Sequence, residues 1–151
     1  MRNLETRKDH AYVWKVRNSG KIRDHGWIDG WSVVDADNGD ILAGGLNHGN
    51  NIRSGRALIN RKRDAQAFVD GYNAAFTDDG EVDPRFLTEK PDGSPGIDRN
   101  AVLHFTSEIA AKMIAADGRM GYRKWFGHGI RRAVSDEVDR RLSGTVESPG
   151  M

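Results

Sequence analysis

Residues 27–46 decide the fold of this chain, and they divide into WIDGWSVVDA (27–36), DNGD (37–40) and ILAGGL (41–46). Aromatic and β-branched residues, which favour strands, dominate the first segment. Asn38-Gly39 between two apolar runs is a strong hairpin signal, because this dipeptide tolerates the positive φ of a tight turn. Residues 11–17 have a similar composition and end at Asn18-Ser19-Gly20, which predicts a preceding strand. We therefore expect a β-meander.

Helical periodicity follows the meander. Apolar residues from Ala65 to Phe76 recur at helical spacing, which predicts a helix over about 61–76 with Asn60 as its N-cap. A second helix is expected over 99–116, with Asp98 as its cap and an apolar face wide enough to make it the most buried helix. After it, the pattern predicts a short piece at 120–126, a break at residues 127–129 and a last helix over about 130–142.

The predicted order of strands and then helices places the chain in the α+β class. We expect a small antiparallel meander of three to four strands, the fourth at 57–59, followed by three to four helices packed on one face. The 151 residues suit a single domain spanning 1–151. Polar composition predicts frayed ends at 1–9 and 143–151. Four turn clusters between the first two helices predict a long loop over 77–97, of a length that is functional or mobile.

Composition excludes several classes of site. The chain has no cysteine, which excludes disulfides, thiolate zinc sites and cysteine nucleophiles. The polar start argues against a signal peptide, and no run of 18 apolar residues offers a membrane span. We expect a soluble cytoplasmic protein that does not engage a membrane.

The sequence contains no recognisable catalytic or cofactor motif. The five histidines are scattered without metal-ligand spacing, and the phosphate-binding glycine loops are missing, so no cofactor or metal is expected. His104, Ser107 and Glu108 share one helical face, but a working triad needs the base between the other two groups. A solvated polar stripe is the favoured interpretation.

Basic residues concentrate in two acid-free segments, 53–63 and 119–132. Three cations at the start of the first helix oppose the helix dipole, a conflict that a bound phosphate would remove. The second segment interleaves cations with aromatic rings, a composition that suits phosphates and unpaired bases. The candidate nucleic-acid or anion-binding residues are Arg53, Arg56, Arg61, Lys62, Arg63, Tyr122, Arg123, Lys124, Trp125, Arg131 and Arg132.

These features favour a non-catalytic binding protein whose partner is anionic, with nucleic acid as the leading candidate. One alternative is a protein-binding regulator or inhibitor, a kind of small protein often carried by mobile elements, which docks by its sheet edge, its aromatic residues or the acidic segment 78–92. Another is an enzyme of unfamiliar type using His48, His128 and carboxylates. Homo-oligomerisation stays open. An acidic and a basic block can also interleave in space and neutralise each other.

Overall fold

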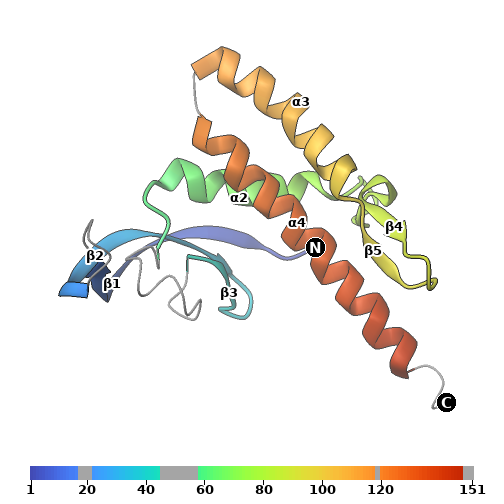
Figure 1. Ribbon diagram of the computed structural model, residues 1–151, viewed down its shortest axis with the longest axis horizontal. Coiled ribbons are helices and arrows are strands. Elements are labelled where there is room, and N and C mark those ends of the chain that lie inside the picture. The colour runs from blue at the N-terminus through green and yellow to red at the C-terminus, as the bar shows by residue number, and fades with distance from the viewer. Residues whose placement is uncertain (17–21, 45–57, 118–119, 148–151) are drawn as a thin grey trace. The chain divides into compact units, whose positions relative to one another are not determined.

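The computed structural model describes residues 1–16, 22–44, 58–117 and 120–147, and it has the α+β architecture expected from the sequence (Figure 1). The chain divides into an N-terminal unit, Arg2–Val69, and a C-terminal unit, Asp70–Met151. The expectation of a single domain stays a prediction. The elements in chain order are β1 (Leu4–Val16), β2 (Ile22–Asp35), β3 (Ile41–Ala43), α2 (Lys62–Ala74), η1 (Pro84–Phe86), β4 (Leu87–Glu89), β5 (Pro95–Ile97), α3 (Arg99–Asp117) and α4 (Met120–Glu147).

The N-terminal unit contains an antiparallel sheet in the order β1-β2-β3. The pairing of β1 with β2 runs from Leu4 opposite Asp35 to Val16 opposite Ile22. The expectation that residues 1–9 fray is therefore wrong from Leu4 onward. Polar side chains do not prevent a strand whose backbone is satisfied by a long partner, and over residues 4–10 of β1 Leu4 and Thr6 are half-buried while the others are exposed.

The hairpin between β2 and β3 is confirmed. Gly39 has φ 80°, a conformation that residues with a Cβ rarely adopt, and its N–H donates to the carbonyl of Asp35 at 2.8 Å. The Asp35 N–H in turn donates to the carbonyl of Asp40 at 2.8 Å. Asn38 does not share the positive φ, and its side-chain oxygen accepts from the Asp40 N–H at 2.9 Å. Glycine and asparagine therefore serve different functions in this turn.

Ile59 continues the sheet as one bridge residue rather than as a strand over 57–59. It exchanges two backbone hydrogen bonds with Trp31, at 2.7 and 2.9 Å. Residue 57 lies outside the described residues. The buried apolar side chains of this unit come from the sheet, from the bridge and from the first half of α2: Val33, Val34, Leu42, Ala43, Leu58, Ile59, Ala65, Ala67, Phe68 and Val69.

Helix α2 confirms the predicted periodicity, but it begins one residue later than expected. The carbonyl of Arg61 accepts from the N–H groups of Asp64 and Ala65 at 3.1 and 3.2 Å. Arg61, not Asn60, therefore occupies the N-cap position.

The C-terminal unit corrects the prediction of a long loop over 77–97. The Phe76–Val82 bridge, η1 and the antiparallel hairpin of β4 with β5 occupy this segment. The glycine clusters are the turns between these short elements, since Gly80 and Gly93 have φ of 80° and 85°. Phe86 is 0% exposed and anchors the segment. Isolated apolar residues between turns carry no period, so their burial cannot be foreseen from spacing.

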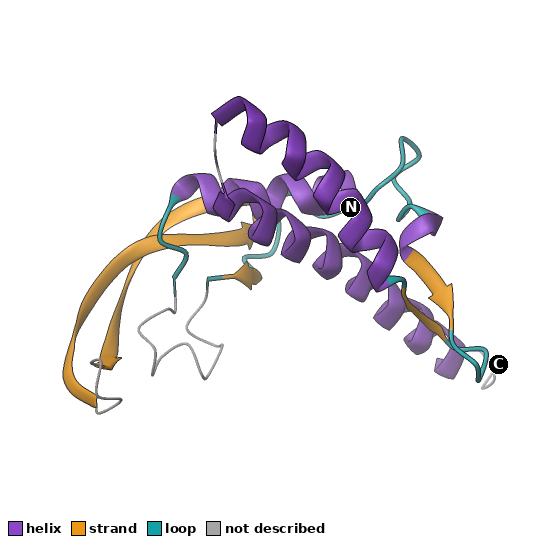
Figure 2. Ribbon diagram, turned by 45° about the horizontal axis from the view of Figure 1, so that its top comes forward, coloured by secondary structure: helices purple, strands orange, loops and turns teal. Residues whose placement is uncertain are grey.

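Helix α3 is capped as predicted, because the Asp98 carboxylate accepts from the Ala101 N–H at 3.0 Å. Helix α4 is one continuous helix, so the predicted break at 127–129 and the predicted fraying of 143–147 are wrong; 148–151 lie outside the described residues. Figure 2 shows α4 without interruption, with β4 and β5 beside its C-terminal half.

Gly71 of α2 lets that helix pack closely against α4, whereas Gly127 of α4 faces α3 at an ordinary contact distance. A Cβ placed on Gly127 would lie 3.5 Å from Thr106 of α3, and one on Gly71 of α2 would lie 2.0 Å from the Phe126 carbonyl oxygen of α4. Tertiary packing offsets the low helix propensity of glycine.

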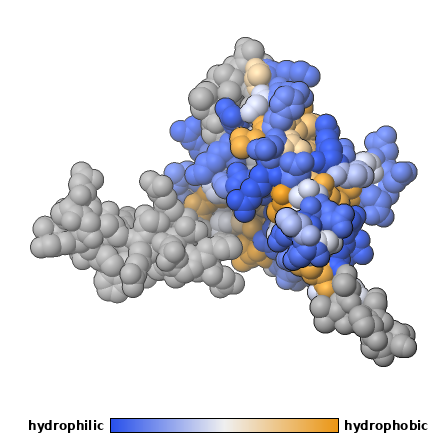
Figure 3. All heavy atoms as spheres, turned by 45° about the vertical axis from the view of Figure 1, so that its right-hand side comes forward, coloured by the Kyte–Doolittle hydropathy of each residue, from blue (hydrophilic) through white to orange (hydrophobic). Residues whose placement is uncertain are grey.

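Over the residues whose burial the structure describes, α3 is not the most buried helix: α2 has the largest buried fraction, and α3 also buries fewer side chains than α4. The buried residues of α4 include Tyr122, Phe126, Ile130, Ala133 and Val134, whereas Leu103 on α3 is 55% exposed. Aromatic rings connect the elements of the C-terminal unit: Phe105 of α3 lies 5.5 Å from Phe86 and 6.2 Å from Phe126, centroid to centroid. On the face drawn in Figure 3, hydrophilic residues cover most of the described surface and apolar residues reach it in patches.

Candidate functional site: a basic groove between α3 and α4

The structure distributes the predicted site residues over both units. Arg53 and Arg56 lie outside the described residues. Arg61, Lys62 and Arg63 stand at the start of α2 in the N-terminal unit, whereas residues 122–132 belong to α4 in the C-terminal unit. That the two basic segments share one surface stays a prediction.

The cations at the start of α2 are exposed and have no ion pair within the part of the chain that the structure describes. The ammonium of Lys62 lies 5.4 Å from the centroid of the Trp31 ring, so it makes a cation–π contact within the N-terminal unit. Asp64 occupies the same turn without pairing with any of the three cations at salt-bridge distance.

A groove of about 520 Å³ lies between α3 and α4. Its cationic lining consists of Arg99, Arg123, Lys124 and Arg131, and no acidic residue is among its described lining residues. The remaining lining residues are Ile97, Val102, Leu103, Thr106 and Gly127. The groove therefore combines apolar lining residues with four positive charges.

The cations of α4 flank a glycine. Arg123 and Lys124 precede Gly127 by about one helical turn, and Arg131 follows it by one turn. Because Gly127 has no side chain, α4 presents a gap between the two sets of cations, with Thr106 of α3 opposite. We refer to this gap, with Arg123, Lys124, Arg131, Gly127 and Thr106 around it, as the glycine notch.

The basic residues of α4 separate into unpaired and paired sets. Among the described residues, Lys124 and Arg131 have no carboxylate at salt-bridge distance, and Arg123 donates to the Ser107 hydroxyl at 2.9 Å. Away from the groove, Arg132 binds Asp136 at 3.0 Å. Arg140 and Arg141 similarly share Glu137, which lowers the pKa of that carboxyl mainly through the hydrogen bond from Arg140. The arginines of α4 that pair with carboxylates therefore lie from Arg132 onward.

Thr106 supplies an unused polar group to the glycine notch. The residue is 5% exposed, and its hydroxyl oxygen is buried with no hydrogen-bond partner among the described residues. A buried hydroxyl without a partner costs about 1–3 kcal/mol, so such groups are uncommon in folded proteins. A ligand oxygen at the notch would provide the missing partner.

Two aromatic members of the predicted site differ in their availability. Tyr122 is 6% exposed, its ring stacks on Phe126 at 5.4 Å, and its hydroxyl donates to Asp70 at 3.2 Å. Its ring is part of the core and has no free face for a base. Trp125 is half-buried, with Lys124 5.4 Å from its centroid.

His128 lies beside the cations of the groove. Burial lowers the pKa of His128 below its ordinary value of 6.5, and the charges of Arg131 and Lys124 lower it further. The side chain packs edge-on against Trp125, with the ring centroids 5.6 Å apart. The lowered pKa favours the neutral form of His128, so it adds little positive charge beside the groove at pH 7.

The polar stripe on α3 is exposed to solvent. His104 lies 2.9 Å from Glu108, and its side chain is 80% exposed, whereas Ser107 instead accepts from Arg123. Ser107 therefore has a cation rather than a base beside it in this structure.

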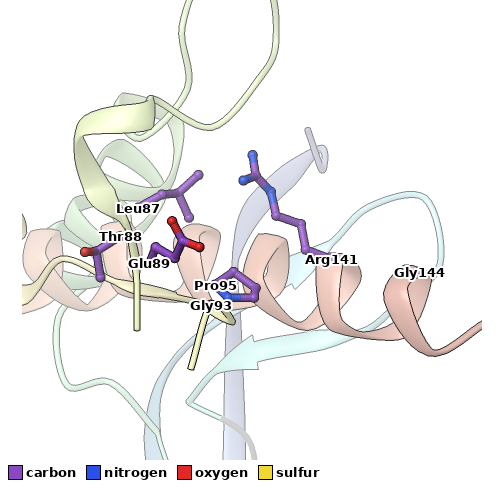
Figure 4. Close-up of a pocket in the computed structure, with 7 residues that line it drawn as sticks. All are labelled: Leu87, Thr88, Glu89, Gly93, Pro95, Arg141 and Gly144. Carbon is purple, nitrogen blue, oxygen red and sulfur yellow. The ribbon is translucent and has the colours of Figure 1, made fainter. Parts of the chain in front are cut away.

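A second cavity, of about 650 Å³, lies between the β4–β5 hairpin and the C-terminal part of α4 (Figure 4). Glu89 and Arg141 contribute opposite charges to its lining, and Arg141 is already paired with Glu137. This cavity has neither the unbalanced charge nor the unused hydroxyl of the groove.

Sequence reasoning missed Arg99 and Thr106. Neither residue lies in a basic segment, and only the packing of α3 on α4 brings them to the groove. No spacing in the sequence points to Arg99 or Thr106. For the arginines outside the groove a signal was available: the i, i+4 spacing of Arg132–Asp136 and Glu137–Arg141 indicates that these arginines pair within the helix.

Within the described residues, no three histidine, aspartate or glutamate side chains are grouped so as to hold a metal ion. None of the described helices has the length and apolar character needed to cross a membrane. Comparison with protein-family models, with curated proteins and with solved structures found no match to this chain.

Proposed function

We propose that this chain is a non-catalytic nucleic-acid-binding protein and that the groove between α3 and α4 is its contact surface. The separation of charges on α4 carries the proposal. Within the described residues, Lys124 and Arg131 line the groove without a carboxylate partner, whereas Arg132, Arg140 and Arg141 outside it are paired with carboxylates. Unpaired cations gathered around one groove favour an anionic partner.

The spacing of the cations favours a polyanion. Lys124 and Arg131 are separated by about 10 Å along the helix axis, at 1.5 Å per residue. Arg99 adds a charge from the start of α3. Cations spread over this length suit successive phosphates, which position a nucleic acid irrespective of its sequence.

The apolar lining residues favour a single strand over a duplex. Ile97, Val102 and Leu103 line the groove together with the cations. An unpaired base can lie against such a surface while its phosphates contact the charged rim, whereas a duplex keeps its bases stacked inside. Exposed Trp125 surface beside Lys124 offers further contact for a base.

The salt dependence of affinity tests this proposal. Fluorescence anisotropy of a labelled single strand would compare wild type with the double variant Lys124→Ala/Arg131→Ala. Each lost phosphate contact reduces the slope of log affinity against log salt by about 0.7 on single strands, so the double variant should flatten it by about 1.4.

The matched control is Arg140→Ala/Arg141→Ala, which removes the same charge from the paired region of the same helix. We expect its slope to equal that of wild type. Equal losses in the two variants would reveal a nonspecific charge effect and overturn the proposed surface. If wild type binds neither single strands nor duplex at low salt, the nucleic-acid proposal is wrong, and a protein-binding regulator becomes the leading candidate.

A further inference from the structure

We infer that the glycine notch binds a terminal phosphate, that is, a phosphate monoester at the end of a nucleic-acid strand or on a free nucleotide. The inference rests on the proposed function and specifies which chemical group the groove recognises. The observation behind it is that the three cations of the notch and Arg99 line the same groove as the buried hydroxyl of Thr106, which has no hydrogen-bond partner among the described residues.

The charge of the notch matches a monoester better than an internal phosphodiester. A phosphodiester carries one negative charge, whereas a monoester carries about −1.5 to −2 at pH 7 and has three strong acceptor oxygens. Arg99, Arg123, Lys124 and Arg131 line the groove with no carboxylate among them. Arginine guanidinium groups bind two phosphate oxygens at once, so two or three arginines can satisfy all three oxygens.

The position of Thr106 also favours a strand end. Thr106 is 5% exposed and lies opposite Gly127, at the base of the groove rather than on its rim. An internal phosphate continues into sugar on both sides, which holds it at the rim. A terminal phosphate has only one substituent, so it can enter end-on and accept the Thr106 hydrogen bond.

Gly127 leaves space for a phosphate in the glycine notch. A Cβ at position 127 would meet only Thr106, at 3.5 Å, which is an ordinary contact. Alanine therefore fits without disturbing the helices, while a larger side chain such as leucine would extend into the space between Lys124 and Arg131. Substituting Gly127 by alanine and then by leucine therefore fills the notch progressively without removing a positive charge.

The test compares one labelled oligonucleotide sequence with a 5′-phosphate, with a 3′-phosphate and with hydroxyl ends, each titrated against the full chain by anisotropy. We expect the preferred phosphorylated end to bind about tenfold more tightly than the hydroxyl-ended strand. In Thr106→Val, which keeps the shape and removes the hydroxyl, the ratio of phosphorylated to hydroxyl-ended affinity should fall substantially. Gly127→Leu should abolish the ratio, and circular dichroism would verify that both variants stay folded.

Competition with adenosine monophosphate separates the two sources of the phosphate. Displacement of the phosphorylated strand at concentrations close to those of the unlabelled strand would identify a free nucleotide as a sufficient ligand. Displacement only by phosphorylated strands would identify the strand end. Both results support the notch.

The outcomes also separate this inference from the proposed function. If all three strands bind alike and Thr106→Val has no effect, the notch inference is overturned while nucleic-acid binding stands. If no strand binds, calorimetry with adenosine monophosphate still tests the notch: binding that Thr106→Val weakens supports it, and the lack of binding overturns it.

Discussion

Replacing Gly71 by alanine is expected to destabilise the protein, although the same change in an unconstrained helix is stabilising. Gly71 lies in the last turns of α2, where the helix crosses α4. An alanine Cβ at this position would lie 2.0 Å from the Phe126 carbonyl oxygen and 2.8 Å from its carbonyl carbon. Both are backbone atoms, so no rotamer change relieves the clash.

The magnitude follows from two opposing effects. Glycine to alanine in a helix interior contributes about 1 kcal/mol of stability through helix propensity. Overpacking typically costs about 1–3 kcal/mol and more where backbone must move, and here two helices must separate until the contact exceeds 3.0 Å. The separation also loosens Tyr72 and Phe126, both buried. We expect a net loss of about 2 kcal/mol, or about 4–8 °C in Tm for a chain of this size.

Two other helical glycines provide matched controls. Alanine at Gly127 meets Thr106 at an ordinary 3.5 Å, and alanine at Gly144 meets nothing within 4 Å. Urea unfolding should therefore show Gly127→Ala more stable than wild type by about 0.5–1 kcal/mol, and Gly144→Ala at least as stable. If Gly71→Ala is as stable as wild type, the close crossing of α2 and α4 at Phe126 does not exist.

Three further predictions concern the turn, the middle segment and pH. Gly39→Val should lower the unfolding free energy by about 1–2 kcal/mol, because φ is 80° at this position, and Gly39→Asn should lower it less. Equal losses of the two variants in chemical denaturation would contradict this explanation. Phe86→Ala should cost about 3–5 kcal/mol, and wild type should resist limited proteolysis within 77–97; rapid cleavage there would show that the segment is not packed. The folded-state pKa of His128 lies below its unfolded value of 6.5, so the folded state binds fewer protons. The unfolding free energy should therefore fall as the pH drops through about 6.5 and level off below the folded pKa. His128→Gln should remove this part of the pH dependence in urea unfolding at pH 7.5 and 5.5, and an unchanged dependence would assign it to another group.

Elements governed by local rules could be predicted from the sequence. The apolar periods of α2 and α3, the Asp98 cap and the hairpin turn at Gly39 all depend on residues within a few positions of one another. Elements that depend on a distant partner were missed. The first half of β1 exists because β2 pairs with it, and the 77–97 segment is ordered because Phe86 is buried in the C-terminal unit.

The candidate site likewise has features that the sequence could identify and features that depend on packing. Composition alone identified Arg123, Lys124 and Arg131 as a basic set. It could not distinguish them from Arg132, because charge pairing depends on which face of α4 each residue occupies. It also placed Tyr122 among the binding residues, although burial makes its ring part of the core.

The sequence by itself determined the α+β class, the hairpin, the helical segments and the surplus of cations in one part of the last helix, because periodicity, turn chemistry and charge are local properties. Only the tertiary structure decided that α4 continues through Gly127 and Gly129, two residues of low helix propensity that are both buried in the folded chain. The packing of α3 on α4 brings Arg99 and Thr106 of α3 to the cations of α4. A groove is a property of two surfaces, and residues far apart along the chain acquire a common environment only when their helices pack together.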